Sequence, residues 1–304
     1  HNEKGKRPVV YRLMNNLRRK VKTMKRKQSE SRLATPYAIW SVLFIVIPLI
    51  LIVFFSFTKQ VDGRYMFTLD NFDKFFNVMY FKVVRRSLVL AFISTVLCLI
   101  VGYPTAYIIS KAKPSRRATL LLLCILPMWM NFLLRTYAWS AILGKNGFIN
   151  TLLGMVGLGP INILYTDAAV LLGMVYNFLP FMILPIHTIL SKMDQDLINA
   201  AKDLGANNFQ VFTKVIFPLS LPGVISGITM VFMPAVSTFV ISKLLGGGQF
   251  YLIGNLIEQE FMSVGDWHFG SAISIFMMII ILISMAIMNK YSSGNDKEGG
   301  GLLL

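Results

Sequence analysis

The sequence is short of charge, cysteine and histidine, and each shortage narrows what the protein can be. Only 14% of its 304 residues are charged while 55% are hydrophobic, which leaves too few polar side chains to cover a water-soluble surface. Cys98 and Cys124 both fall in apolar stretches, where we expect small packed side chains and not disulfide or metal chemistry. The three histidines are too scattered along the chain to build a metal site. The composition therefore indicates a membrane protein without a metal centre.

Motifs for nucleotide binding and covalent catalysis are also missing. No Gly-x4-Gly-Lys-Ser/Thr loop, which would cradle nucleotide phosphates, occurs anywhere in the sequence. The apolar stretches contain no paired carboxylates and no nucleophile with an adjacent base. We therefore expect no enzymatic activity and no cofactor in this chain, so any ATP and Mg²⁺ must be used by a separate subunit.

Long apolar runs are what the sequence does contain. Spanning about 30 Å of hydrocarbon takes about 20 apolar residues in a helix, and several stretches reach that length. They are Tyr37 to Phe57, Ser87 to Ser110, Ala118 to Leu143, Ala168 to Leu190, Leu219 to Ile241 and Phe269 to Met288. The first run is too long for the core of a secretory signal and is expected to stay in the membrane. The sequence thus predicts an all-α integral membrane protein with six transmembrane helices.

The basic residues predict which side of the membrane each end occupies. The net charge is +16, and many of the 30 Lys and Arg residues crowd into positions 1–32. Basic residues beside membrane spans are retained in the cytoplasm, so we expect a cytoplasmic N-terminus and, after six spans, a cytoplasmic C-terminus. The bases around the first external loop, from Lys59 to Arg86, disagree with this rule. No nucleic-acid partner is expected, because the charge is not spread over a folded surface.

The chain divides into three predicted regions. Residues 1–36 form a basic segment, either an amphipathic helix on anionic membrane lipid or a disordered tail that sets topology. Residues 37–290 form the transmembrane domain, which carries a polar loop at 192–218. Residues 291–304 form a tail with a glycine-rich end that we leave out of the fold. Gly223 and Gly227 form a GxxxG motif that predicts close helix packing, between subunits or between adjacent spans.

The polar loop at 192–218 is predicted to form two short helices separated by a glycine. Asp194 or Asp196 can cap a helix from Leu197 to Leu204, and Gly205 supplies the left-handed residue that ends it. Asn207 or Asn208 can cap a second helix, before Pro218 begins the next span. This second helix has an apolar side of Phe209, Val211, Phe212 and Val215, which would fit a partner's groove or fold back on the bundle itself.

The same loop resembles the EAA loop of ABC importer permeases. The resemblance rests on the run Asn199 to Ala206, read NAAKDLGA, and on the ending Val215-Ile216-Phe217-Pro218. It implies a type I ABC importer permease fold in which the loop is the coupling helix held by the ATPase. Asn199 stands where the family has Glu, so an ion pair made there is not implied. The implied coupling residues are Asn199, Ala200, Ala201, Asp203, Leu204, Gly205, Ala206, Phe209 and Phe212.

Further segments resemble the spermidine/putrescine branch of this family. They include FTLDN from Phe67, LIVGYP from Leu99, PMWMN from Pro127, RTY from Arg135, LIGN from Leu252 and GDWHFG from Gly265. The resemblance covers the chain from about Tyr37 to Lys290. It implies a bacterial inner-membrane assembly with a second related permease, an ATPase dimer and an extracytoplasmic polyamine-binding protein.

The chemistry of a polycation suggests where its path would run. Ammonium groups need carboxylates at the mouth of the path and aromatic faces within it. The acids expected at the external ends are Asp167, Glu258, Glu260 and Asp266, and Glu258 and Glu260 also suit docking of the binding protein. The expected lining comprises Trp129, Asn131, Tyr137, Tyr176, Asn177 and Phe178. Trp139, near the end of a span, is expected to pack at the membrane interface instead. Arg135, the one charge well inside a span, is expected to be structural or gating.

Two alternatives stay open at this point. One is an importer permease for another small solute, such as thiamine, ferric iron or an anion. The other is a secondary carrier or channel that works without ATP, although Arg135 alone makes no ionisable relay inside the spans.

Overall fold

The computed structural model describes residues 35–248 and 251–299. The chain divides into two units, one ending at Phe54 and the other beginning at Phe55. The interpretation of residues 1–34 as a lipid-bound helix or a tail, and that of residues 300–304, lie outside the described residues.

The described part of the first unit belongs to one apolar helix that runs from Thr35 to Ser56. It consists of a π-helical turn, η1 (Val42–Val46), followed by α2 (Ile47–Ser56). Pro48 follows the wide turn by two residues, and proline has no N–H to donate to a carbonyl in the preceding turn. The helix is long and apolar enough to cross a membrane, as the sequence predicts for this segment.

The second unit begins with a small hairpin and a short helix. Strands β1 (Thr58–Val61) and β2 (Arg64–Phe67) are antiparallel, with Thr58 opposite Phe67. Asp62 and Gly63 join the strands with φ angles of 50° and 77°, the left-handed conformation that tight hairpin turns require. The hairpin leads into α3 (Asp70–Phe75).

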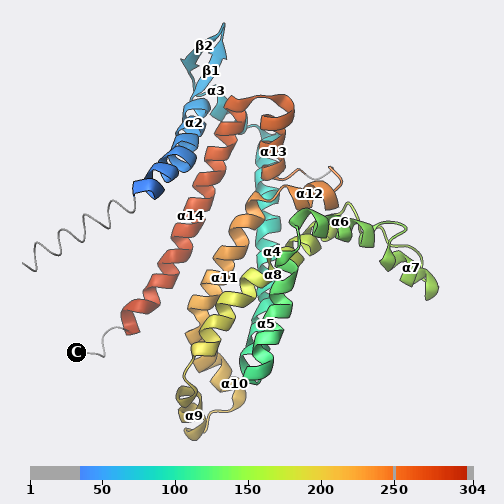
Figure 1. The fold of residues 1–304 in the computed structure, drawn as a ribbon, viewed down its shortest axis with the longest axis vertical. Helices are drawn as coiled ribbons and strands as arrows, with labels where there is room; N and C mark the ends of the chain where they lie inside the picture. The colour runs from blue at the N-terminus through green and yellow to red at the C-terminus, as the bar shows by residue number, and fades with distance from the viewer. Residues whose placement is uncertain (1–34, 249–250, 300–304) are drawn as a thin grey trace, which may run out of the picture. The chain divides into compact units, whose positions relative to one another are not determined.

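Three long helices form the centre of this unit (Figure 1): α4 (Val78–Lys111), α8 (Asp167–Lys192) and α11 (Phe217–Ser237). Shorter helices follow α4 and connect it to α8, namely α5 (Pro114–Trp129), α6 (Phe132–Leu143) and α7 (Phe148–Met155). Between α8 and α11 lie α9 (Gln195–Asp203), α10 (Asn208–Val211) and the π-helical turn η2 (Phe212–Ile216). The chain continues through α12 (Val240–Leu245), α13 (Ile253–Gln259), η3 (Glu260–Val264) and α14 (Trp267–Gly299).

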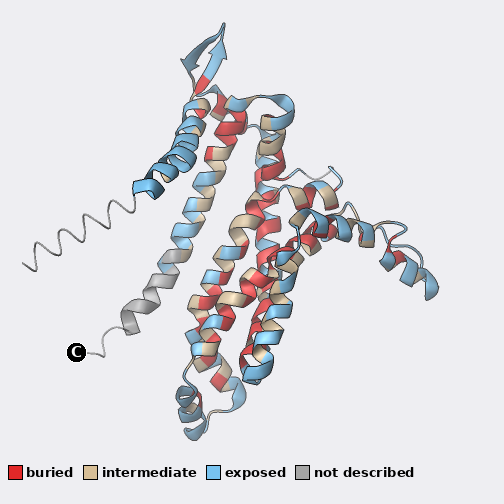
Figure 2. Cartoon of the chain, viewed as in Figure 1, coloured by how far each residue is buried: buried red, intermediate tan, exposed pale blue. Residues whose placement is uncertain are grey.

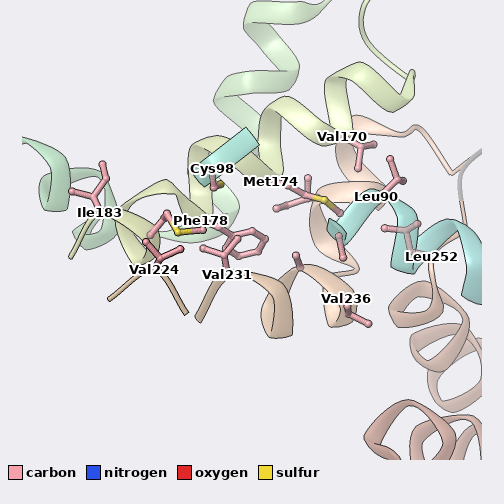
Figure 3. Close-up of a cluster of buried hydrophobic side chains, with 14 of the residues drawn as sticks. Leu90, Cys98, Val170, Met174, Phe178, Ile183, Val224, Val231, Val236 and Leu252 are labelled. Carbon is pink, nitrogen blue, oxygen red and sulfur yellow. The ribbon is translucent and has the colours of Figure 1, made fainter. Parts of the chain in front are cut away.

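The apolar core lies where α4, α8 and α11 meet (Figure 2), and Figure 3 shows side chains from all three helices in it. Met174 and Met182 of α8 are fully buried there. A Cβ atom on Gly227 would lie 2.7 Å from the sulfur of Met182, and one on Gly223 would lie 3.0 Å from the carbonyl oxygen of Pro185. The GxxxG motif therefore brings α11 close to α8 within this chain, one of the two arrangements that the motif predicts.

The predicted span from Ala118 to Leu143 is wrong as a single straight helix. The chain bends by 92° between α5 and the helical stretch that begins at Phe132. Asn131 causes the new start, because its side-chain oxygen accepts hydrogen bonds from the backbone N–H groups of Leu133 and Leu134. Hydrophobicity alone does not register such a cap. Within the described residues there are five helices suited to crossing a membrane, or six if this bent pair is one span.

The predicted fifth span is also wrong at both ends. Its helix begins at Asn208 and is continuous to Ser237, through η2 and past Pro218. Pro218 follows the wide turn of η2 by two residues, as Pro48 follows η1, so the proline is accommodated inside the helix and does not start it. At the other end, Thr238 and Phe239 separate α11 from α12.

We predict that Gly223→Ala lowers the melting temperature of the purified protein in detergent by several degrees. The added methyl group would be forced against the backbone of α8, and such overpacking costs about 1–3 kcal/mol. Gly154→Ala in α7 is the matched control, because a Cβ there meets open space and alanine favours a helix. Equal melting temperatures for the two variants would contradict the close packing of α8 and α11.

Candidate functional site

The first part of the polar loop is a capped helix that ends at a left-handed glycine. Asp194 begins α9 by accepting a hydrogen bond from the N–H of Asp196 at 2.9 Å. At the other end the N–H of Gly205 donates to Lys202 O at 2.8 Å and that of Ala206 donates to Ala201 O at 3.0 Å. This pair of bonds is a Schellman motif, and Gly205 has a φ of +85°. The predicted conformation of Gly205 is confirmed.

The second part of the loop starts at a reciprocal cap. The side-chain oxygen of Asn207 accepts from the N–H of Gln210, and the Gln210 side chain accepts from the N–H of Asn207, both at 2.9 Å. This capping box selects Asn207, and not Asn208, as the residue that begins the helix. Because that helix continues into α11, the loop is rigidly connected to a long helix of the bundle.

One side of the loop is anchored to the bundle. Ile198, Val211 and Ile216 are buried. The ring of Phe212 lies 5.9 Å from that of Tyr103 and 5.8 Å from that of Tyr107, both on α4. Phe212 therefore packs against its own chain, so for this side chain the structure has the second of the two predicted arrangements, in which the helix folds back on the bundle.

The other side of the loop is exposed. Leu204 is 89% exposed and Phe209 is 75% exposed, which is unusual for large apolar side chains on a polar loop. Asn199, Ala200 and Asp203 are exposed as well, whereas Ala201 and Ala206 are half-buried. Among the predicted coupling residues, Asn199, Ala200, Asp203, Leu204, Gly205 and Phe209 thus form a surface that is open to another protein, whereas Ala201, Ala206 and Phe212 pack against the chain's own core.

We predict opposite consequences for the two phenylalanines of the loop. Phe209→Ala should leave the melting temperature nearly unchanged and weaken co-purification of an ATPase subunit, because this ring touches little of its own chain. Phe212→Ala should lower the melting temperature, because it removes ring contacts with α4. Stability measurements on both variants with pull-down of the ATPase test this, and a destabilised Phe209→Ala protein would refute the assignment.

The four acids expected at the external ends lie at separate places: Asp167 at the start of α8, Glu258 near the end of α13, Glu260 at the start of η3 and Asp266 just before α14. Three of them are neutralised by a base of this chain. Asp167 pairs with Arg86, Glu258 with Lys243 at 2.6 Å, and Asp266 with Lys74 at 3.8 Å. The sequence analysis paired none of these bases with its acid, since partners 15 or more residues apart carry no local pattern that joins them.

Glu260 differs from the other three acids. It is buried at the start of η3, with 8% of its surface exposed, and it makes no hydrogen bond or ion pair with another residue in the described part of the chain. Burial raises the pKa of its carboxyl group above the usual 4.5, and the charge of Asp266 raises this pKa further. The ammonium of Lys74 acts in the opposite direction.

Because the pKa of Glu260 is raised in the folded protein, Glu260→Gln should increase the stability of the fold by an amount that depends on pH. Below about pH 4 both the folded and unfolded forms hold the proton, so the carboxyl adds no penalty. Above the usual pKa the unfolded form loses the proton first, and the wild-type protein loses stability as the pH rises. The variant should therefore melt at a higher temperature than wild type at pH 7.5, and the difference should shrink as the pH falls toward 4. Glu258→Gln, which loses its pair with Lys243, should show no such gain.

The residues expected to line a path do not share one environment. Trp129 and Tyr137 are 77% and 56% exposed, and Asn131 is the cap of α6. Asn177 and Phe178 are buried between helices of the core. Tyr176 packs at 5.2 Å against the ring of Trp139. The structure therefore places these side chains at the break between α5 and α6 and inside the bundle, and their role in a path stays a prediction.

Arg135 lies one turn into α6 and is buried, with 7% of its surface exposed. Its guanidinium carbon lies 5.9 Å from the centre of the Phe132 ring. Nε and Nη1 have no hydrogen-bond partner in the described part of the chain. A buried guanidinium with free donors suits a structural contact with a group from outside this chain, in line with the expected role.

A pocket that the sequence did not predict lies between α11, α13, η3 and α14. Its volume is about 660 Å³, and Glu258 contributes to its wall. Most of the lining is apolar, with Phe239, Phe261, Met262, Trp267 and Met277 among its residues. The whole lining comes from α11, the turn after it, α13, η3 and α14, so no local pattern in the sequence indicates the pocket.

The comparisons with known proteins identify the class of this protein. Residues 32–294 match the family of binding-protein-dependent transport system inner membrane components, and the chain belongs to this family. Its fold is that of ABC importer permeases. A bacterial ABC transporter that imports the acidic polysaccharide alginate has a chain that matches with a TM-score of 0.77 at 17% identity, covering 90% of this chain and 98% of that one. A chain of the MetNI methionine ABC transporter matches with a TM-score of 0.53 at 15% identity, covering 70% and 94%.

Particular relatives are closer in sequence. The spermidine/putrescine transport system permease protein PotB of Haemophilus influenzae is 43% identical over 249 residues, which cover 80% of this chain and 87% of that protein. PotB of Escherichia coli K12 is 39% identical over 264 residues, which cover 85% and 96%. The chain is therefore a multi-pass permease subunit of the bacterial inner membrane and not an enzyme.

Proposed function

We propose that this chain is the permease subunit of an ATP-driven importer that moves polyamines into the cytoplasm. The observation that carries the proposal is the identity of 43% and 39% to two spermidine/putrescine permeases over nearly their whole length. Glu260, the acid without a recorded base among the described residues, supports it, because a carboxylate suits the ammonium groups of a polyamine. The partners are a second related permease, an ATPase dimer that uses ATP and Mg²⁺, and an extracytoplasmic polyamine-binding protein.

The exposed side of the polar loop is the surface that the ATPase holds. Leu204 and Phe209 provide apolar contacts, and α9 presents Asn199 and Asp203 beside them. A short helix with exposed apolar side chains binds in a groove of a partner, which excludes water from those side chains. The loop and both termini then lie in the cytoplasm, and the end of the unit that carries η3 and the start of α14 faces the binding protein.

The anchored side of the loop transmits movement of the ATPase to the bundle. Phe212 packs on α4, and the helix that starts at Asn208 continues as α11. A displacement of α9 and α10 therefore moves two of the three central helices, and the central helices alternate between an outward-open and an inward-open packing. Prolines inside α4, α8 and α11 allow these helices to bend.

Uptake by the complete transporter in proteoliposomes tests the proposed function. With ATP inside and loaded binding protein outside, the wild type should accumulate putrescine or spermidine. Accumulation of sulfate or thiamine in place of polyamines would favour the alternative of another small solute. Uptake driven by an ion gradient with this chain alone would favour the carrier.

Gly205→Val should abolish most of this uptake while the protein still inserts. A left-handed β-branched residue costs about 1–2 kcal/mol, and relief of that strain would rearrange the junction of α9 and α10. Gly63→Val is the matched control, because Gly63 has a φ of +77° and open space around its Cβ position but lies in the hairpin at the other end. Normal uptake by Gly205→Val would count against the coupling role of the loop.

A further inference from the structure

The short helix α3 is held firmly against α14. The ring of Phe75 is buried and lies 4.2 Å from the ring of Phe276. The side chain of Asn71 is also buried and donates hydrogen bonds to the carbonyl oxygens of Ser56 and Thr58, at 3.1 and 3.0 Å. These contacts fix Lys74, the neighbour of Phe75, beside the start of α14.

The ammonium of Lys74 lies in an environment of opposite charge and aromatic surface. Its nitrogen is 3.8 Å from Oδ2 of Asp266 and 5.7 Å from the centre of the Phe269 ring. Tyr80 packs edge-on against the same ring at 5.1 Å. A carboxylate together with a ring face is the combination that recognises alkylammonium ions.

The site holds one more negative charge than Lys74 can balance. Oδ1 of Asp266 accepts from the N–H of Phe269 at 3.0 Å, which leaves Oδ2 directed to Lys74. Glu260 is the second acid, and its charge interacts with those of Asp266 and Lys74. Glu260 is more than nine-tenths buried and has no hydrogen-bond or ion-pair partner among the described residues. The carboxylate oxygens of Glu260 are not among the fully buried, unpartnered atoms of the described residues, so they reach solvent at this site. A carboxylate that is partly withdrawn from water and has no bonded partner is better matched by additional positive charge than by Lys74 alone.

We propose that Asp266, Glu260 and the face of Phe269 form a binding site for a primary ammonium group, and that Lys74 occupies this site until a substrate ammonium displaces it. This inference rests on the proposed function, since the substrate ammonium is that of a polyamine. Lysine is a suitable occupant because its side chain ends in the same alkylammonium group as putrescine. The side chain of Lys74 is 52% exposed, so it can leave the site for water without unfolding α3.

The pair of Lys74 and Asp266 is not needed to hold α3 in place. Exposed ion pairs at this distance contribute little to stability, whereas the buried Phe75 and Asn71 already fix the helix. The pair of Lys59 and Asp70 provides a direct comparison. It has the same separation of 3.8 Å and nearly the same lysine exposure of 51%, but neither a buried second acid nor a ring face is recorded beside it.

Equilibrium binding of radiolabelled putrescine to the purified complex of both permeases and the ATPase, without the binding protein, tests the site. Lys74→Gln removes the internal competitor and should tighten binding about tenfold. Glu260→Gln keeps the shape but removes the buried charge, and should weaken binding by at least about tenfold. Lys59→Gln, the matched control, should bind as wild type does, and Lys74→Arg should restore competition.

The outcomes separate this inference from the proposed function. If wild-type transporter accumulates polyamines but Lys74→Gln binds putrescine no more tightly than Lys59→Gln, the site is refuted and the function stands. Weaker binding by Lys74→Gln would likewise refute displacement and make the pair a structural clamp. If Lys74→Gln fails to assemble, unchanged binding by Glu260→Gln refutes the site independently. No polyamine uptake by wild type overturns the proposed function, and the inference with it.

Discussion

The close approach of α8 and α11 is the constraint on which the rest of the second unit depends. Gly223 and Gly227 leave no room for a Cβ atom, so the two backbones lie nearly in contact over a full helical turn. The tightly packed core then extends to α4, whose Gly102 lies against Met182. Because this core is close-packed, it positions the loops at its two ends.

The sequence alone predicts those features that depend on neighbouring residues. A glycine after an amphipathic stretch ends a helix, and Gly205 does so in a Schellman motif. A carboxylate before a helix caps it, as Asp194 does. Most membrane spans follow from the length of the apolar runs, because every backbone group in lipid must be bonded within its own helix.

One local cap and several contacts between distant residues were not predicted from the sequence. The helix breaks at Asn131 inside a stretch that stays apolar on both sides, so average hydrophobicity does not show the break. The cap made by Asn131 shows where the helix turns. Nothing in the local sequence distinguishes the burial of Phe212 from the exposure of Phe209. The difference arises from the contact of Phe212 with α4. The bases that pair with the acids are the third example, since Lys74 lies nearly two hundred residues from Asp266 in the chain.

The unbroken helix from Asn208 to Ser237 has a mechanical consequence. Its 30 residues span about 45 Å, comparable to the full thickness of a bilayer with its headgroups. A rigid-body tilt of this helix about its close contact with α8 would move its two ends in opposite directions. Tilting it by about 10° around its midpoint would carry each tip roughly 4 Å in opposite directions. If the loop is the coupling surface that we propose, a push of a few ångströms at the capping box of Asn207 and Gln210 would move the far end of this helix by a similar distance.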